Sequence, residues 1–542
     1  MGEPLNQSYV RGASTPPLID LTVGALFDAA VKRAPDATAL IVCHQDICWT
    51  WAEFGHRVDR LAAGLRARGL VPGERVGIWA PNCAEWAIVQ FATAKAGLIL
   101  VNINPAYRTT ELEYALNKVG CAALITTPAD RNHDQLAMLR EIGRARLPQL
   151  RLMVTIGDDM HDGFVRFPDL ACQDILELDR IFVKPTDIIN IQFTSGTTGS
   201  PKGAALTHRN IVNNAFQVGS RIGLSAADRL CLPVPLYHCF GMVMGNLASV
   251  AHGTTIVYPA AAFDPLATLS AIAAERCTAL YGVPTMFIAM LEHAEFARFD
   301  LGSLRTGIMA GSPCPVAVME SVIARMHMRK VTIAYGMTET SPVSFQSDID
   351  DPVELRVSTV GRVQPHLEVK LVDAEGEIVP LGDTGELCTR GYSVMSGYWD
   401  EPTRSADAID GEGWMHSGDL ATLDAQGYCR IVGRLKDLII RGGENIYPRE
   451  IEDHLMTHPE IVDAQVIGVP DDRYGETVCA WIILRQGMAI DEDEIRAHCQ
   501  NSLARFKTPK YIRFVSEFPL TVSGKVQKAV MREIMGAKIK RP

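Results

Sequence analysis

The chain has 542 residues, of which 47% are apolar and 21% are charged, and its formal net charge is −11. This composition is ordinary for a globular protein, and the length predicts about three or four folding units. The negative charge argues against a nucleic acid or an anionic membrane surface as partner, because no basic stripe offsets it. The 13 cysteines are scattered without a Cys-x-x-Cys pair, and so neither a zinc site nor a disulfide framework is indicated.

No targeting or membrane-spanning segment is expected. The first twenty residues carry acidic side chains and a single base, Arg11, which fits neither a signal peptide nor a transit peptide. The long apolar run 86–103 contains Lys95 in its middle, and its pattern predicts a helix over 83–96 followed by a strand over 98–103. The sequence therefore predicts a soluble, cytoplasmic protein.

Up to about residue 430, apolar runs typical of strands alternate with helical stretches. The strand-like runs include 75–79, 122–126, 255–258 and 332–335, and the helical stretches include 53–68 and 266–276. This alternation predicts βαβ units, and hence a layered α/β fold with strands buried on both faces. Around 367–390, short strands separated by turn signals predict a small antiparallel or barrel-like subdomain.

We place a domain boundary near 433–437. The residues beyond it contain candidate strands near 463–468 and 478–484 and a candidate helix at 493–503, enough for an independent α+β domain. We therefore divide the chain into an N-terminal domain, 1–435, and a small C-terminal domain, 436–542.

The segment Thr194–Gly203, Thr-Ser-Gly-Thr-Thr-Gly-Ser-Pro-Lys-Gly, is a candidate phosphate-binding loop. Glycine lets successive backbone N–H groups point at one anion, and Lys202 adds a positive charge. The loop is predicted to lie between a strand at 187–193 and a helix at 207–216, a favourable place for phosphate. It is not a Walker loop, because Pro201 occupies a position where that motif needs glycine. The alternative is a flexible linker.

Two acidic residues lie in turns that suit a nucleotide site. Glu339, within Tyr335–Thr340, is a candidate Mg²⁺ ligand, because Mg²⁺ binds through one or two carboxylates and the substrate phosphates. Its alternative is an acid at a helix N-terminus. Asp419 follows a glycine and is suited to accept hydrogen bonds from a ribose diol; its alternative is a turn aspartate.

Two basic residues complete the set. Arg434 is a candidate partner of a phosphate or a ribose, with a surface salt bridge as the alternative. Lys525 lies on a glycine turn near the C-terminus, within Leu520–Lys528, where an isolated lysine is usually solvated.

Taken together and in this order, these segments resemble the acyl-activating adenylate-forming superfamily. This superfamily comprises acyl-CoA synthetases, aryl-CoA ligases, firefly-type luciferases and peptide-synthetase adenylation domains. The segments span 194–528, and the motifs at 104–107 and 111–114 extend the resemblance over nearly the whole chain. Within the superfamily, the sequence is most similar to medium-chain acyl-CoA synthetases of the acyl-CoA synthetase family member 2 type.

The resemblance implies an ATP-dependent carboxylic acid:CoA ligase. Such an enzyme forms an acyl-adenylate with release of pyrophosphate, and then transfers the acyl group to coenzyme A with release of AMP. ATP, Mg²⁺ and coenzyme A are the implied cofactors and co-substrates. The alternatives are an aryl-acid CoA ligase, an adenylating enzyme that serves a separate carrier protein or an oxygenase, and a nucleotide-sensing protein without catalysis. The sequence does not decide whether the protein forms a homodimer.

The resemblance also assigns roles to residues. The phosphate loop would hold the β- and γ-phosphates, Glu339 would bind Mg²⁺, and Lys525 would bridge the substrate carboxylate and the α-phosphate. The implied catalytic residues are Thr338, Glu339, His238 and Lys525. The implied ATP-binding residues are Thr194, Ser195, Gly196, Thr197, Thr198, Gly199, Lys202, Gly311, Ser312, Pro313, Tyr335, Thr338, Asp419, Arg434 and Lys525.

In the family, the C-terminal domain rotates about a hinge residue between two poses. The hinge maps to Lys436, where many relatives carry aspartate; Asp437 follows, and which of the two moves most stays open. In the second pose, Gly442, Gly443 and Glu444 would line the coenzyme A tunnel, with glycine allowing close backbone approach.

The resemblance places the acyl pocket among mostly apolar residues. They are Tyr237, His238, Val283, Met309, Gly311, Gly336 and Met337. With no arginine or lysine to pair with a second carboxylate, a monocarboxylic acid with an apolar tail of small to medium length is favoured. His238 is expected to act as a gate or to orient the carboxylate; the alternative is a packed core histidine.

Overall fold

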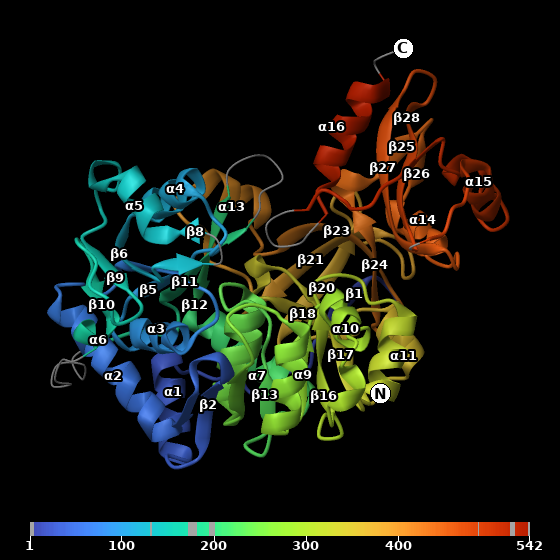
Figure 1. The fold of residues 1–542 in the computed structure, drawn as a ribbon. Coiled ribbons are helices and arrows are strands. Elements are labelled where there is room, and N and C mark those ends of the chain that lie inside the picture. Colours follow the sequence, from blue (N-terminus) through green and yellow to red (C-terminus); the bar gives the residue numbers. More distant parts are fainter. Residues whose placement is uncertain are drawn as a thin grey trace.

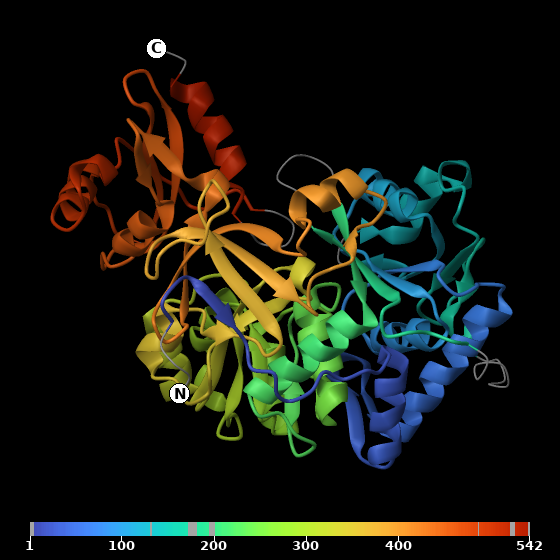
Figure 2. The ribbon, with the colours of Figure 1, turned by 180° about the vertical axis from the view of Figure 1, so that it is seen from behind.

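The computed structural model describes residues 5–130, 133–171, 181–194, 201–485, 487–520 and 526–539. Its elements form two large sheets, a smaller antiparallel sheet and a C-terminal unit with a sheet of its own (Figure 1; Figure 2). The predicted layered α/β fold with a barrel-like subdomain and a small α+β unit at the C-terminus is confirmed. Some predicted site residues lie outside the described range: Ser195, Gly196, Thr197, Thr198, Gly199 and Lys525.

The first large sheet contains eight strands in the order β10-β9-β6-β4-β5-β11-β12-β22. The strands from β10 to β11 are parallel, and β12 and β22 are antiparallel to their neighbours. In chain order the strands are β4 (Arg75–Trp79), β5 (Ile99–Asn102), β6 (Cys121–Thr126), β9 (Leu152–Thr155), β10 (Val165–Arg166), β11 (Ile188–Thr194), β12 (Lys202–Thr207) and β22 (Gly397–Tyr398). The helices α4 (Thr109–Val119) and α5 (Gln135–Ile142) pack against one face.

The second large sheet contains nine strands in the order β19-β18-β17-β16-β15-β13-β14-β2-β3. Its strands from β17 to β2 are parallel. The strands are β2 (Thr38–Val42), β3 (Ile47–Thr50), β13 (Arg229–Cys231), β14 (Thr255–Tyr258), β15 (Ala279–Gly282), β16 (Thr306–Ala310), β17 (Lys330–Gly336), β18 (Val343–Gln346) and β19 (Arg362–Val363). The helices on its outer face are α9 (Pro265–Glu275), α10 (Pro284–Leu291), α11 (Val316–Arg325) and α12 (Val353–Ser358).

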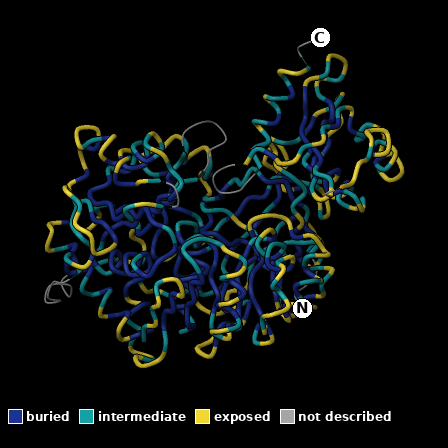
Figure 3. The backbone as a smooth tube through the Cα atoms, in the orientation of Figure 1, coloured by how far each residue is buried: buried dark blue, intermediate teal, exposed yellow. Residues whose placement is uncertain are grey.

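A layer of helices between the two sheets contributes to the largest core of the molecule. Buried side chains of these helices and of strands from both sheets form one continuous cluster, seen as the dark interior of Figure 3. The helices are α1 (Val23–Arg33), α2 (Trp51–Ala67), α3 (Ala84–Lys95), α7 (His208–Arg221) and α8 (Ala248–His252), together with the π-helical segment Phe240–Leu247. Because both sheets pack on the same helices, residues at the ends of different sheets are held in fixed relative positions.

The elements around the phosphate loop partly correct the prediction. The loop was expected to join a strand directly to a helix, but β12 intervenes and pairs antiparallel with β11, with Thr194 opposite Lys202. The helix α7 follows β12, and the Thr207 side chain caps it by accepting a hydrogen bond of 3.1 Å from the Asn210 N–H. Of the residues of β12, only Lys202 and Gly203 belong to the predicted loop, and no strand was predicted over Lys202–Thr207.

The apolar run 86–103 forms α3 followed by β5, as predicted. Lys95 pairs with Asp28 and Asp59, which satisfies its charge inside the helix layer. In the part of the chain that the structure describes, no helix combines the length and the apolar character needed to cross a membrane.

The barrel-like subdomain is an antiparallel sheet in the order β1-β20-β21-β23-β24. Its strands are β1 (Tyr9–Arg11), β20 (Leu367–Val372), β21 (Gly385–Gly391), β23 (Met415–Leu423) and β24 (Cys429–Arg434). The prediction missed β1, because three residues near the N-terminus carry too little pattern to be read as a strand. Short elements elsewhere are β7 (Ala129–Asp130), β8 (His133–Asp134), α6 (Phe167–Leu170) and α13 (Pro402–Ala408).

The C-terminal unit stands above the barrel-like sheet in Figure 1 and has its own core. Its sheet has the order β26-β25-β28-β27, and β29 pairs with β28. The elements are β25 (Ile439–Arg441), β26 (Glu444–Ile446), α14 (Pro448–Leu455), β27 (Ile461–Asp471), β28 (Gly475–Leu484), α15 (Glu492–Gln500), β29 (Tyr511–Phe514) and α16 (Lys528–Ile539).

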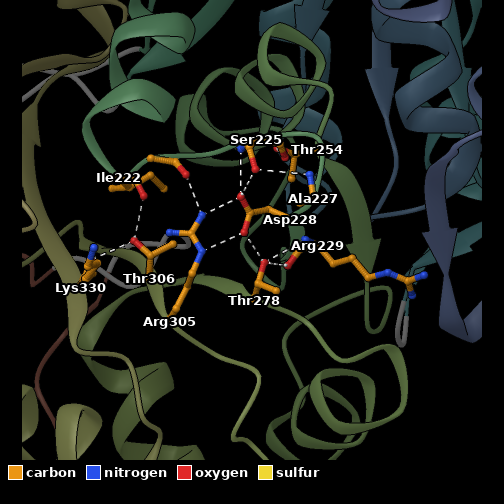
Figure 4. A network of polar contacts seen from close by, with 11 residues as sticks. Ile222, Ser225, Ala227, Asp228, Arg229, Thr254, Thr278, Arg305, Thr306 and Lys330 are labelled. Atoms are coloured by element: carbon orange, nitrogen blue, oxygen red, sulfur yellow. Dashed lines mark hydrogen bonds and ion pairs between the residues drawn. The ribbon is translucent and has the colours of Figure 1, made fainter. Parts of the chain in front are cut away.

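A polar network holds the amino-terminal ends of the parallel strands in the second sheet (Figure 4). Asp228, before β13, accepts hydrogen bonds from Arg305 Nη2 at 2.6 Å and from Thr278 Oγ1 at 2.7 Å. Ser225 also donates to it, through both its backbone N–H and its hydroxyl. These residues precede three different strands, so the network fixes the strands relative to one another. It lies at the edge of the sheet opposite to the predicted site residues, and we interpret it as structural.

Candidate adenylation site

The predicted site segments meet at the carboxyl ends of the parallel strands. Val283 follows β15, Gly311 follows β16, and Tyr335 lies at the end of β17. Thr194 ends β11 in the other large sheet. Open α/β sheets bind their ligands at this edge, because the loops that leave the strands there are free to vary while the strands hold them in place.

Glu339 connects the two large sheets. Its Oε1 accepts a hydrogen bond of 2.9 Å from the Tyr398 hydroxyl, and the Thr194 hydroxyl lies 3.4 Å from the same oxygen. Glu339 is only 6% exposed, and it belongs to the turn after β17, whereas Thr194 and Tyr398 belong to the first sheet. The structure therefore brings the predicted metal ligand to the start of the predicted phosphate loop.

Tyr398 contacts the candidate site, and the sequence did not predict it. Its ring faces the Lys202 ammonium, which lies 4.7 Å from the ring centroid, and burial together with the nearby Glu339 charge raises the pKa of its hydroxyl. Tyr398 lies on β22, which pairs with β12. The only signal in the sequence is a Gly-Tyr-Trp run in a turn-rich stretch, which does not indicate that its hydroxyl reaches Glu339.

The far end of the phosphate loop is also anchored. The Tyr114 hydroxyl on α4 donates a hydrogen bond of 3.0 Å to the Pro201 carbonyl. The loop thus begins beside Glu339 and ends beside α4, with Lys202 at the start of β12.

A second carboxylate, Asp419, lies within β23 of the barrel-like sheet. The Tyr335 hydroxyl donates a 2.6 Å hydrogen bond to Asp419 Oδ2, and the Arg434 guanidinium contacts Oδ1 at 2.9 Å. Asp419 and Arg434 are directly opposite each other on β23 and β24. Burial and the Asp419 charge raise the pKa of the Tyr335 hydroxyl well above its usual value, so that it remains a donor. Three of the predicted ATP-binding residues, Tyr335, Asp419 and Arg434, are therefore neighbours.

The turn that follows β17 and carries Glu339 requires glycine at position 336. A Cβ atom on Gly336 would lie 1.7 Å from the Pro342 carbonyl oxygen. That oxygen accepts hydrogen bonds from the Met337 N–H and from the Thr340 hydroxyl, which fixes the turn that carries Thr338 and Glu339. Any side chain at Gly336 would push this turn away from the strand.

Five of the predicted acyl-pocket residues fall into three separate places. Tyr237 and His238 are adjacent, with ring centroids 5.2 Å apart, and the Asn102 amide holds the Tyr237 carbonyl at 3.1 Å. A Cβ atom on Gly311 would lie 3.1 Å from a methyl group of Val283, so these two residues share one wall. Met309 is buried in a different core, on the side of the sheet covered by α10 and α11.

The segment predicted to bind coenzyme A is held by contacts within the C-terminal unit. Gly442 has a φ of +60°, and its N–H donates to the Tyr474 carbonyl at 2.8 Å. Gly442, Gly443 and Glu444 form the turn between β25 and β26, within the C-terminal unit and apart from the strand ends of the second sheet (Figure 1). The structure does not bring this segment to those ATP-site residues that it describes.

Comparison with known sequences identifies the family. The AMP-binding enzyme family matches residues 27–399, and the AMP-binding enzyme C-terminal domain matches residues 450–525. The chain belongs to the AMP-binding enzyme family. The predicted resemblance to adenylate-forming enzymes is therefore confirmed.

Relatives within this family align with most of the length of this chain. The mitochondrial medium-chain acyl-CoA ligase ACSF2 of Danio rerio is 47% identical over 551 residues, which cover 98% of this chain and 91% of that protein. The human ligase of the same name is 43% identical over 552 residues, covering 97% and 90% of the two chains. The predicted similarity to family member 2 enzymes is confirmed.

Solved structures of AMP-binding enzymes share the fold. The anthranilate CoA ligase AuaEII in complex with anthranoyl-AMP superimposes with a TM-score of 0.88 at 28% identity, over 97% of this chain and 99% of that one. ATP-bound MatB from Rhodopseudomonas palustris gives a TM-score of 0.85 at 29% identity, over 95% and 99%.

Proposed function

We propose that this chain activates a small- to medium-chain apolar monocarboxylic acid with ATP and transfers the acyl group to coenzyme A. The enzyme class, an AMP-forming acid–thiol ligase, is confirmed by relatives of 42–47% identity that are named acyl-CoA ligases. The observation that carries the proposal is the placement of two carboxylates at one edge of the fold. Glu339 faces the phosphate loop, and Asp419 lies with Tyr335 and Arg434.

The chemistry explains why these groups are needed. The substrate carboxylate attacks the α-phosphorus of ATP, and pyrophosphate leaves; no enzyme nucleophile is required. Both reactants are anionic, so the barrier is dominated by charge repulsion and by charge that develops on the phosphoryl oxygens. Lys202 and the backbone N–H groups of the loop would hold the leaving pyrophosphate. Lys525 would supply the positive charge between the carboxylate and the α-phosphate.

The residues near Glu339 fit a magnesium ion. Mg²⁺ prefers oxygen ligands and binds through one or two carboxylates together with substrate phosphates. Within the described residues, both side-chain hydrogen bonds of Glu339 end on Oε1, which leaves Oε2 for a cation. A cation there would neutralise charge on the phosphates, while Tyr398 and Thr194 hold the carboxylate in place.

Asp419 would accept hydrogen bonds from the ribose hydroxyls. Its two oxygens already point in different directions, one toward Tyr335 and the other toward Arg434. A diol that binds in this place adds donors to a carboxylate whose orientation is fixed. Gly311, Ser312 and Pro313 would line the adenine with Tyr335, and Thr338 would contact the α-phosphate.

The identity of the acid rests on the pocket and on the relatives. The predicted pocket is apolar apart from Tyr237 and His238, and the named relatives are medium-chain ligases. The aryl-acid alternative draws on the anthranilate CoA ligase, which shares the fold at lower identity. An apolar pocket separates acids that differ by one methylene by only about 1–3 kcal/mol, so activity on several neighbouring chain lengths is expected.

The second half-reaction would need the C-terminal domain, 436–542, to rotate. Asp437 pairs with Arg532 on α16 and is therefore attached to the moving domain, while Arg434 is attached to Asp419 on the large domain. Lys436 lies between these two anchors, and we assign the rotation to it. After rotation, Gly442 and Gly443 would lie against the thiol.

The decisive experiment measures pyrophosphate release across aliphatic and aromatic acids, with and without coenzyme A. We expect the fastest release with medium-chain aliphatic acids, and acyl-CoA as a product only when coenzyme A is present. Faster release with aryl acids would favour the aryl-acid alternative. Release without thioester formation would indicate a carrier-protein acceptor, and absence of release with every acid would overturn the proposal. A cytoplasmic location and a homodimer remain proposals, to be tested by fractionation and by light scattering.

A further inference from the structure

Three side chains with metal-binding atoms converge on the barrel-like sheet, outside the adenylation site. Glu386 and Cys388 are two residues apart on β21 and so point to the same face, and Cys388 lies directly opposite His416 on β23. His416 Nδ1 lies 2.9 Å from Glu386 Oε2 and 3.4 Å from Cys388 Sγ. The three ligand atoms all lie within 4.8 Å of one another.

Two of the three ligand separations are close to those in a tetrahedral zinc site. A tetrahedral zinc ion with its usual bond lengths separates sulfur and nitrogen ligands by about 3.5 Å, and nitrogen and oxygen ligands by about 3.3 Å. The observed separations, 3.4 Å between Cys388 Sγ and His416 Nδ1 and 2.9 Å between His416 Nδ1 and Glu386 Oε2, need shifts of only a few tenths of an ångström. One thiolate, one imidazole and one carboxylate form a mixed donor set that suits Zn²⁺ better than the hard cation Mg²⁺.

The groups behind these ligands are also arranged as in a metal site. The other imidazole nitrogen, His416 Nε2, faces Asp410 Oδ2 at 3.7 Å, and Asp410 Oδ1 is held by the Trp414 and Glu412 N–H groups at 2.9 Å. The second oxygen of Glu386 accepts a 3.0 Å hydrogen bond from the Gly418 N–H. Carboxylates that orient a ligating histidine, and donors that orient a ligating carboxylate, are regular partners of zinc ligands.

The local charge favours a divalent cation. The charged groups around the cluster are Glu386, Asp410 and Lys370. Lys370 lies on the adjacent strand β20, where its backbone pairs with that of Cys388 on β21. Together the three groups carry one negative charge. Adding Zn²⁺ and converting the thiol to a thiolate brings the sum to zero, which is acceptable in a partly buried place.

We propose that Glu386, Cys388 and His416 form a zinc-binding site with three protein ligands and a fourth position open to water. On binding, Cys388 releases its thiol proton to solvent. The imidazole proton moves from Nδ1 to Nε2, where Asp410 accepts its hydrogen bond, so that a neutral His416 coordinates through Nδ1. His416 is about one-third exposed, at 33%, and Cys388 is fully buried, so the ion enters from the His416 side.

The proposed zinc site lies next to Asp419, the residue that we propose binds the ribose. Glu386 holds the Gly418 N–H, and Gly418 precedes Asp419, whose own N–H is held by the Ser417 hydroxyl at 3.1 Å. A metal ion bound to Glu386 and His416 would connect β21 and β23 next to this turn. The sequence analysis found no zinc signal because the ligands are brought together by strand pairing and not by short spacing.

The test uses Co²⁺ as a spectroscopic substitute for Zn²⁺ in the full-length, chelator-treated protein. Cys43 and Cys48 are exposed and could bind cobalt adventitiously, so all measurements use a Cys43→Ser/Cys48→Ser background. We expect a thiolate-to-cobalt charge-transfer band that saturates at about one equivalent, is displaced by Zn²⁺, and accompanies release of about one proton per metal ion.

Two variants and a control locate the ion. Cys388→Ser and His416→Asn should abolish the charge-transfer band, whereas Cys429→Ser should retain it, because Cys429 is an equally buried thiol on the neighbouring strand β24. His416 is partly exposed, so His416→Asn tests the site even if the buried Cys388 variant fails to fold. Absence of the band in the background protein, or an unchanged band in His416→Asn, would overturn the proposal.

Discussion

The contact between Tyr398 and Glu339 gives the sharpest test of how the adenylation site is built. Tyr398→Phe removes one hydroxyl and leaves the ring that faces Lys202 in place. If Tyr398 orients the proposed magnesium ligand, the substitution should weaken the response of the enzyme to Mg²⁺. It should not change the acid preference, because neither residue belongs to the predicted acyl pocket.

The magnitude follows from the charge and burial of Glu339. A hydrogen bond to a charged group contributes about 1.5–3 kcal/mol. Glu339 is 6% exposed, so water replaces the lost donor poorly, and the remaining contact with Thr194 is long, at 3.4 Å. Part of the loss would be recovered when a cation holds the carboxylate. We therefore expect about 1.4 kcal/mol in cation binding, equal to a tenfold rise in the Mg²⁺ concentration for half-maximal rate.

The assay is the initial rate of pyrophosphate release at saturating ATP and acid, titrated with Mg²⁺. The rate at saturating Mg²⁺ should remain close to that of the wild type, because the contact acts on binding of the cation. Tyr281→Phe is the matched control. Its hydroxyl is buried and has no hydrogen-bond partner in the described structure, so its removal should leave the titration unchanged.

Two results would refute the reasoning. One is an unchanged Mg²⁺ titration in Tyr398→Phe, which would mean that Tyr398 does not position Glu339. The other is an equal shift in Tyr398→Phe and Tyr281→Phe, which would show a general response to the loss of a buried hydroxyl. Glu339→Gln should lose activity at every Mg²⁺ concentration, and it separates loss of the ligand from loss of its support.

Three further predictions test other parts of the structure. Lys525→Ala should slow acyl-adenylate formation by about 10²–10³-fold while sparing thioester formation from supplied acyl-AMP; equal loss in both half-reactions would contradict its assignment. Gly442→Val should do the reverse in the same two assays, because its φ of +60° and a Cβ contact of 3.1 Å with Tyr474 distort the β25–β26 turn; unchanged thioester formation would exclude this turn from the thiol path. Arg305→Ala should destabilise the fold by about 1–2 kcal/mol at neutral pH in urea unfolding, a reduced value because Arg305 is 38% exposed. Burial raises the pKa of Asp228, but hydrogen bonds from Arg305, Thr278 and Ser225 outweigh this effect and hold the pKa below its usual value. The ion pair therefore stabilises the fold above the usual pKa of aspartate, and this stabilisation is lost as pH falls through the folded pKa. The difference in the free energy of unfolding between wild type and variant should close below about pH 4.

The sequence predicted the architecture where local pattern and tertiary environment agree. The run that became α3 and β5 could be divided correctly because Lys95 and the following glycine mark the end of the helix. By contrast, β12 was missed, since Lys202–Thr207 forms a strand only because β11 and β22 lie on either side of it. Pairing between segments distant in the chain leaves no local signal.

The same distinction separates the site residues that were predicted from those that were not. Glu339 and Asp419 were candidates because each stands in a short polar motif, although each also had a structural alternative as an acid at a helix N-terminus or in a turn; their roles stay predictions. Tyr398 and the Glu386–Cys388–His416 cluster were missed, because their partners come from other strands. Contacts between side chains on different strands depend on the register of strand pairing, which no single segment specifies.

The contacts of Lys436 and Asp437 support the proposal that Lys436 is the hinge, an alternative that the sequence left open. Lys436 and Asp437 were both candidates for the residue that moves. Asp437 pairs with Arg532 on α16 of the C-terminal unit, so movement at Asp437 would disturb this partly buried ion pair. Burial and the nearby Arg434 charge lower the pKa of Lys436, and the nearby Asp437 and Asp419 charges only partly oppose this shift. Among the described residues Lys436 forms no ion pair, so we propose that rotation at Lys436 breaks no such contact while Asp437 anchors the C-terminal domain.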